Sequence, residues 1–192
     1  SAASDVYKRQ VLQISEFEDN SWISMTNPTT EELFSVSSTY KIAPDDLRAS
    51  LDEEERSRIE IEEYYSLILV DIPTIEERNG KDWYGTIPLA IIICDKVIVT
   101  VCLEDSPVLT AFMDGRVRNF YTHMKTRFIF QILYRNATLY LNYLRIIDRR
   151  SDAIEQKLHE ATKNRELIEL LELEKSLVFF TTSLKSNEVV LE

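Results

Sequence analysis

The distribution of glycine and proline is the feature that most constrains this chain. All five prolines and all three glycines fall before residue 116, and residues 123–192 contain neither. Because both residue types destabilise the interior of a helix, such a stretch favours long helices. The chain therefore divides near Tyr121. Residues 11–120 carry strand and turn patterns, and residues 121–192 carry a helical pattern.

Apolar residues of the second region recur at alternating spacings of three and four, which is typical of a coiled-coil seam. The first run is Ile129, Leu133, Ala137, Tyr140, Leu144, Ile147, Ser151, Ile154 and Leu158, and the second is Leu170, Leu173, Leu177, Phe180, Leu184, Asn187 and Leu191. With a turn at Thr162–Arg165, these runs predict an antiparallel helical hairpin. A helix from about Tyr121 to Thr162 is on the order of 60 Å long, so it projects from the globular part or packs on another subunit.

Strand and helix-start signals alternate in the first region. Strands are predicted at residues 11–14, 22–25 and 65–72, the last ended by Pro73, and in a hairpin of residues 87–94 and 97–103 around Asp95-Lys96. Helices are predicted after Thr29, which forms a capping box with Glu32, at Pro44, and between Ser106 and Gly115. The hairpin register sets Cys94 opposite Val97 and Cys102 opposite Leu89, so the cysteines are predicted to be packing residues in a reducing, cytosolic compartment.

Charge and composition exclude several function classes. The net charge is −11, with 23 acids and 11 bases up to residue 122, which argues against nucleic acid as a partner. The three glycines form no phosphate-binding pattern, so no organic cofactor is predicted. The longest apolar run, residues 87–94, is far shorter than the ~20 residues of a membrane-spanning helix.

Two groups of acidic residues are candidate cation ligands. Nine acids lie between Asp45 and Glu63, and the pair Glu76-Glu77 is expected in a hairpin loop that Asn79-Gly80 closes. Hard carboxylate oxygens suit Mg²⁺ or Ca²⁺, whereas the alternative is a solvated acidic surface. Neither histidine has metal-ligand or catalytic spacing, and His123 and His159 are expected on helix surfaces. The chain is not predicted to be an enzyme.

The two ends of the chain suggest a piece of a longer protein. Residues 1–10 have neither an initiator Met nor a signal-peptide pattern and are expected to be a non-native remnant. The last residues, from Val189 to Glu192, continue a helical pattern without a stop signal.

One segment resembles a known family. Arg56-Ser57-Arg58-Ile59-Glu60, followed by Glu63-Tyr64-Tyr65-Ser66-Leu67-Ile68-Leu69, is similar to the strand start of the cytoplasmic domain of CorA-like magnesium transporters, with Ser57 where proline is usual. The helix start at residues 27–33, the Pro44 helix, the Asp95-Lys96-Val97-Ile98-Val99-Thr100-Val101 hairpin segment and the long helices follow in the order of that family. The resemblance covers residues 11–192.

The resemblance implies an α/β/α sandwich with a mixed sheet, followed by a long antiparallel helical hairpin. It also implies a homopentameric membrane protein in which this piece is the regulatory, cation-sensing domain on the cytoplasmic side; the isolated piece is compatible with a monomer. The stalk helix and the membrane helices of the family lie outside this chain. Mg²⁺ is the implied transported and regulatory ion, and Glu76 and Glu77 match the loop that holds the family's regulatory ion. A further acid of the family's regulatory site aligns with Tyr134, so this chain has a tyrosine at that position.

Three alternatives stay open at this point. The chain is also compatible with a zinc or cobalt transporter relative of the same fold, because ion choice resides in the pore. A soluble coiled-coil interaction protein would use the same helical seams on a partner. Metal-dependent phosphoester hydrolysis by the acidic residues is the third alternative, although no spacing supports it.

Overall fold

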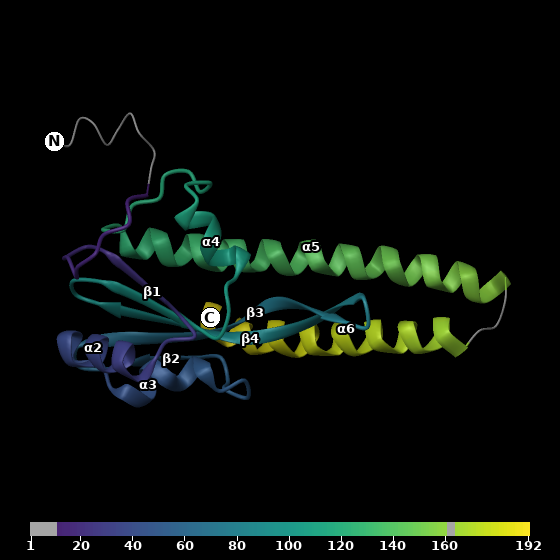
Figure 1. Cartoon of the computed structure of the whole chain (residues 1–192), viewed down its shortest axis with the longest axis horizontal. Helices are drawn as coiled ribbons and strands as arrows, with labels where there is room; N and C mark the ends of the chain where they lie inside the picture. The colour runs from purple at the N-terminus through teal and green to yellow at the C-terminus, as the bar shows by residue number, and fades with distance from the viewer. Residues whose placement is uncertain (1–10, 161–163) are drawn as a thin grey trace.

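A five-stranded sheet lies between two layers of helices in the computed structural model, which describes residues 11–160 and 164–192 (Figure 1). The elements in chain order are β1 (Trp22–Thr26), α2 (Thr30–Tyr40), α3 (Pro44–Arg48), the 3₁₀ turn η1 (Ala49–Leu51), β2 (Arg58–Ile61), β3 (Tyr65–Arg78), β4 (Lys81–Cys94), β5 (Ile98–Cys102), α4 (Pro107–Met113), α5 (Lys125–Glu160) and α6 (Asn164–Leu191). The expected remnant at residues 1–10 lies outside the described residues.

The sheet is mixed, as the family resemblance implies. Its strand order is β1-β5-β4-β3-β2. β1 runs parallel to β5, and the other neighbours are antiparallel. A parallel pair requires a long connection, which here carries α2, α3 and the β2–β4 strands. The predicted α/β/α sandwich is confirmed.

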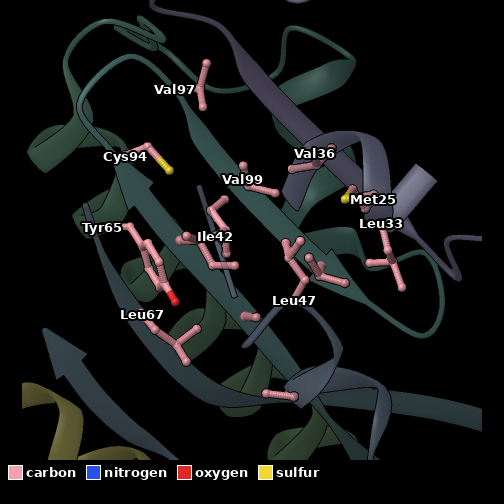
Figure 2. Packing of buried hydrophobic residues seen from close by; sticks show 14 of the residues in the cluster. Met25, Leu33, Val36, Ile42, Leu47, Tyr65, Leu67, Cys94, Val97 and Val99 are labelled. Atoms are coloured by element: carbon pink, nitrogen blue, oxygen red, sulfur yellow. The ribbon is translucent and has the colours of Figure 1, made fainter. Parts of the chain in front are cut away.

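Both faces of the sheet are buried because helices cover each of them. Successive residues of a strand therefore pack against opposite helix layers. Leu67 and Leu69 of β3 join the cluster formed with α2 and α3, where Leu33, Val36 and Leu47 pack on the sheet (Figure 2). The intervening residues of β3, Ile68 and Val70, join the cluster on the opposite face with α4, α5 and the end of α6.

All three predicted helix starts are present, although α3 begins at Pro44 without a side-chain cap, and capping bonds confirm the other two. The Thr29 hydroxyl accepts from the backbone N–H of Glu32 at 3.2 Å, and the Glu32 carboxylate accepts from the N–H of Thr29 at 2.8 Å. Ser106 caps α4 by accepting from the N–H of Val108 at 3.2 Å. Gly115 follows α4 with a φ of 68°, the left-handed conformation that ends many helices.

The strand predictions are correct in part. Residues 22–26 form β1, but residues 11–14 form no strand and are exposed to solvent. Pro73 does not end β3, which pairs with β4 through Pro73 and Thr86. Proline is tolerated there because β2 pairs only with residues 66–69, so the missing N–H breaks no bond on that outer edge.

The second hairpin has the predicted register. The N–H of Cys94 donates to the carbonyl of Val97 at 2.9 Å, and Leu89 pairs with Cys102. Both cysteines are buried and free.

The predicted helical hairpin is present as α5 and α6, which extend beyond the β3–β4 hairpin (Figure 1). Its seam is confirmed from Tyr140 onward, where Ile147 and Ile154 of α5 share a buried cluster with Leu173 and Phe180 of α6. Of the predicted turn at Thr162–Arg165, residues 162 and 163 lie outside the described residues. None of the described helices combines the length and the hydropathy needed to cross a bilayer.

Nearer its start, α5 uses a different face from the predicted one. Phe128, Ile132 and Asn136 are buried there, whereas the predicted seam residues Leu133 and Ala137 are not. The seam prediction was wrong by one position because this half of α5 packs chiefly on the sheet and α4, and meets α6 at Val190. In α6, Leu184 and Leu191 are likewise exposed, at 37% and 68%.

The β3–β4 hairpin is clamped to both long helices. Tyr84 is 1% exposed and lies in one cluster with Tyr140 and Phe180. At the hairpin tip, Lys81 forms an ion pair with Glu169 of α6. Arg150 of α5 lies 3.5 Å from the same carboxylate. The hairpin thus fixes α5 and α6 relative to the sheet.

Candidate cation-binding site

The two predicted cation ligands, Glu76 and Glu77, lie within β3 and not in a loop after it. The β3–β4 ladder continues as far as Arg78. The loop prediction was wrong because Asn79 and Gly80 close the hairpin alone, with φ values of 54° and 74°. Two left-handed residues form a tight turn that matches the twist of a hairpin, so the strands extend right up to it.

Glu76 and Glu77 point in different directions, because consecutive strand residues alternate between faces. They therefore do not converge on one cation within a single chain. Glu76 accepts from Arg78 Nε at 3.0 Å and Nη2 at 2.8 Å. Glu77 pairs across the hairpin with Asp82, and both side chains are exposed. Two like charges opposite one another repel, which a divalent cation would offset.

The negative charges of Glu76 and Glu53 both act on a third acid, Glu104. Partial burial raises the pKa of Glu104, and the negative charges of Glu76 and then Glu53 raise it further. The three carboxylates come from the segment after η1, from β3 and from the segment after β5. Glu53 belongs to the acidic run noted in the sequence, whereas no sequence signal connects Glu104 with Glu76.

A second acidic group joins Asp46, Glu60 and Glu62. One carboxylate oxygen from each lies within 4.8 Å of the others. Asp46 is on α3, Glu60 is on β2, and Glu62 directly follows β2. Among the described residues, this is the only such group of three or more His, Cys, Asp or Glu side chains. All three belong to the acidic run, but no spacing within that run distinguishes them from its other six acids.

Neighbouring side chains orient this second group. The Tyr65 hydroxyl donates to Asp46 and accepts from the N–H of Ala43 at 3.2 Å. Burial, followed by the bond to Asp46, raises the pKa of Tyr65 to about 12, so its hydroxyl remains a donor at neutral pH. Arg58 donates to Glu60. The carboxylates are thus partly engaged, and their remaining oxygens are hard ligands of the kind that Mg²⁺ prefers.

Among the side chains that the structure describes, the other reactive groups do not form a site. His123 is exposed beside Tyr121, and the side chain of His159 lies outside the described part of the structure. Burial raises the pKa of each of the thiols of Cys94 and Cys102 to about 11, which keeps both as unreactive thiols at neutral pH.

Comparison with known proteins identifies the family. The family described as "CorA-like Mg2+ transporter protein" matches residues 17–192. The cobalt/magnesium transport protein CorA of Methanocaldococcus jannaschii is 31% identical over 179 residues, which are 88% of this chain and 53% of that protein. The chain belongs to the CorA family of membrane transporters, as the sequence resemblance indicates.

Solved structures agree with this assignment. The complete structure of the CorA magnesium transporter from M. jannaschii matches with a TM-score of 0.81 and 27% identity, over 94% of this chain and 57% of that one. The structure of the soluble domain of the same protein matches with a TM-score of 0.75 and 26% identity, over 88% of this chain and 68% of that one. The chain thus spans about half the length of the transporter that it resembles.

Proposed function

We propose that this chain is the cation-sensing regulatory domain of a CorA-type divalent-cation transporter, with Mg²⁺ as the regulatory ion. The observation that carries the proposal is the convergence of Asp46, Glu60 and Glu62 from separate elements in a chain of this family. The negative charges of Glu76 and Glu53, which act on Glu104, support it. Mutual repulsion of such groups opposes the folded arrangement or its assembly, and a bound divalent cation offsets the repulsion.

The proposal extends to the whole protein. Residues 11–120 and 121–192 are the sandwich and the helical hairpin of a domain on the cytoplasmic side, and a membrane part conducts the ion. The family resemblance supports a homopentamer, in which Glu76 and Glu77 face neighbouring subunits. In that assembly, Glu77 binds a cation that is shared between two chains. Its exposed position opposite Asp82 is consistent with this role.

Cobalt is the second candidate ion. The relative from M. jannaschii is named a cobalt/magnesium transport protein. Carboxylate oxygens bind both ions, so the domain is expected to respond to Co²⁺ as well as to Mg²⁺. Competition between the two ions for one site would distinguish a shared sensor from separate sites.

The test is a Mg²⁺ titration of the purified chain, followed by calorimetry, melting temperature and native mass. Binding at millimolar Mg²⁺ is expected, and Asp46→Asn/Glu60→Gln should weaken it if the second group is the site. Glu76→Gln and Glu77→Gln, tested separately, should weaken any association that Mg²⁺ induces. Glu31→Gln is the matched control, because Glu31 is an exposed acid on α2. The absence of both Mg²⁺ binding and Mg²⁺-induced association would contradict the proposed cation sensing.

A further inference from the structure

The C-terminal end of α6 is joined to the sheet by a side-chain amide that takes the place of a strand. Asn187 is 8% exposed. Its Oδ1 accepts from the backbone N–H of Asp71 at 2.7 Å, and its Nδ2 donates to the carbonyl of Asp71 at 2.8 Å. This paired donor and acceptor reproduce the bonds that a neighbouring β-strand would make to one residue.

The position of Asn187 follows from where β2 begins. β2 pairs with β3 only from Arg58 opposite Leu69, so the outer edge of β3 has no strand partner at Asp71. A buried N–H and C=O left unpaired at that edge would be costly. The Asp71 carbonyl also accepts from Asn136 Nδ2 and from the Tyr140 hydroxyl, so it is at the Asp71 N–H that Asn187 removes this cost. The sequence pattern identifies Asn187 only as a polar member of an apolar seam.

The same side chain also contacts the segment that leads into β2. The Ser57 hydroxyl donates to Asn187 Oδ1 at 2.8 Å, and the Ser57 N–H donates to Ser186 Oγ at 3.3 Å. Ser57 is itself 8% exposed. One carboxamide therefore bonds three segments: the residue before β2, the free edge of β3 and the end of α6.

Apolar packing at this end of α6 is incomplete, so the polar bonds carry more of the attachment. A groove of about 380 Å³ separates α5 from α6 here, and Asn187, Leu184 and Leu191 line it. Val190 is buried against the sheet, whereas Leu191 is 68% exposed. Segments with few buried apolar contacts open locally at lower free energy than the rest of a domain.

We propose that Asn187 is a latch that couples the docking of the last turns of α6 to the segment leading into β2. When the bonds of Asn187 break, residues 183–191 and residues 57–61 open together, while the centre of the sheet stays closed. The latch links the end of α6 to β2, the strand that carries Glu60. Opening of either segment therefore favours opening of the other.

Hydrogen exchange by mass spectrometry on the whole 192-residue chain tests the latch. Asn187→Ala is expected to speed exchange about tenfold or more in both residues 57–61 and residues 183–191, with β4 and β5 unchanged. Asn136→Ala is the matched control, because Asn136 Nδ2 donates to the same Asp71 carbonyl at 2.9 Å from α5. This control should not loosen residues 57–61.

A second variant keeps the test decisive if Asn187→Ala does not fold. Ser57→Ala removes one bond to Asn187 and leaves the backbone intact, and it should still speed exchange at residues 183–191. Faster exchange in both segments with either variant supports the latch. Faster exchange in one segment alone, in neither, throughout the chain, or equally in Asn136→Ala overturns it.

Discussion

The guanidinium carbon of Arg78 lies 3.8 Å from the centroid of the Trp83 ring across the hairpin. The Trp83 ring in turn meets Phe179 of α6 edge to face, with centroids 5.6 Å apart. Arg78 is thereby held beside Glu76, whose carboxylate it binds. The positive charge of Arg78 is thus already paired with Glu76, which is one of the candidate cation ligands.

Removing this internal cation should favour an external one. Arg78→Gln frees Glu76 and leaves the local negative charge unopposed, so Mg²⁺ affinity at this group is expected to rise about two- to fivefold at low ionic strength. Isothermal titration calorimetry measures the change. Arg127→Gln on α5 is the control for net charge alone. Unchanged or weaker binding in Arg78→Gln would indicate that Glu76 is not a ligand.

The ion pairs of Glu169 should stabilise the clamp between the hairpin and the long helices. Hydrogen bonds and charges from Lys81 and Arg150 lower the pKa of Glu169, despite its partial desolvation. The stabilisation is present above the ordinary pKa of the group and is lost as the pH falls through the lowered value. Glu169→Gln should therefore lower the melting temperature at pH 7 by a few degrees and lower it less as the pH falls below the ordinary pKa, whereas Glu172→Gln should change neither.

The Asp71 carboxyl should have the opposite pH dependence. Burial raises its pKa above the ordinary 3.8, although a bond to Ser183 opposes the rise. Its contribution to stability is greatest below that ordinary value and is lost as the pH rises through the raised value. Asp71→Asn is expected to raise the melting temperature at pH 7 and to flatten its dependence on pH above the ordinary pKa of the group. A lower melting temperature at pH 7 would show that the charged form is needed.

Tyr84 is expected to be a principal anchor of the helical hairpin. It is 1% exposed and meets Tyr143 and Phe180 at ring distances of 5.4 Å and 6.2 Å. Tyr84→Ala should lower the free energy of unfolding by about 3–5 kcal/mol, as is usual for large-to-alanine changes in a core. Urea denaturation gives the value. Tyr134→Ala, at a residue that is 74% exposed, should change it by less than about 0.5 kcal/mol.

Local sequence signals predicted the elements well, because those elements depend on local chemistry. The capping box at Thr29, the Asp95-Lys96 turn and the glycine-free helices were recognised from neighbouring residues alone. The site was harder to predict, because the approach of Glu104 to Glu76, and of Asp46 to Glu60, depends on the tertiary fold. The shifted face of α5 has the same cause, since a helix pattern does not reveal which surface the helix meets.

The strand prediction at Pro73 illustrates the limit most clearly. Proline normally ends a strand, and the sequence does not reveal that its missing N–H faces an edge that β2 does not reach. The same hidden edge explains why Asn187 was interpreted as part of a helical seam. The division of the chain at about residue 120 and the metal role of Glu76 and Glu77 stay predictions.

The pairing of Asn187 with Asp71 also has a consequence for the behaviour of the protein at high concentration. A free strand edge is a template on which another molecule can add a strand, and such addition leads to aggregation. By covering the open edge of β3, α6 protects the domain from this route even though β2 has only four residues. The short edge strand is therefore tolerated because a helix, and not another strand, completes the border of the sheet.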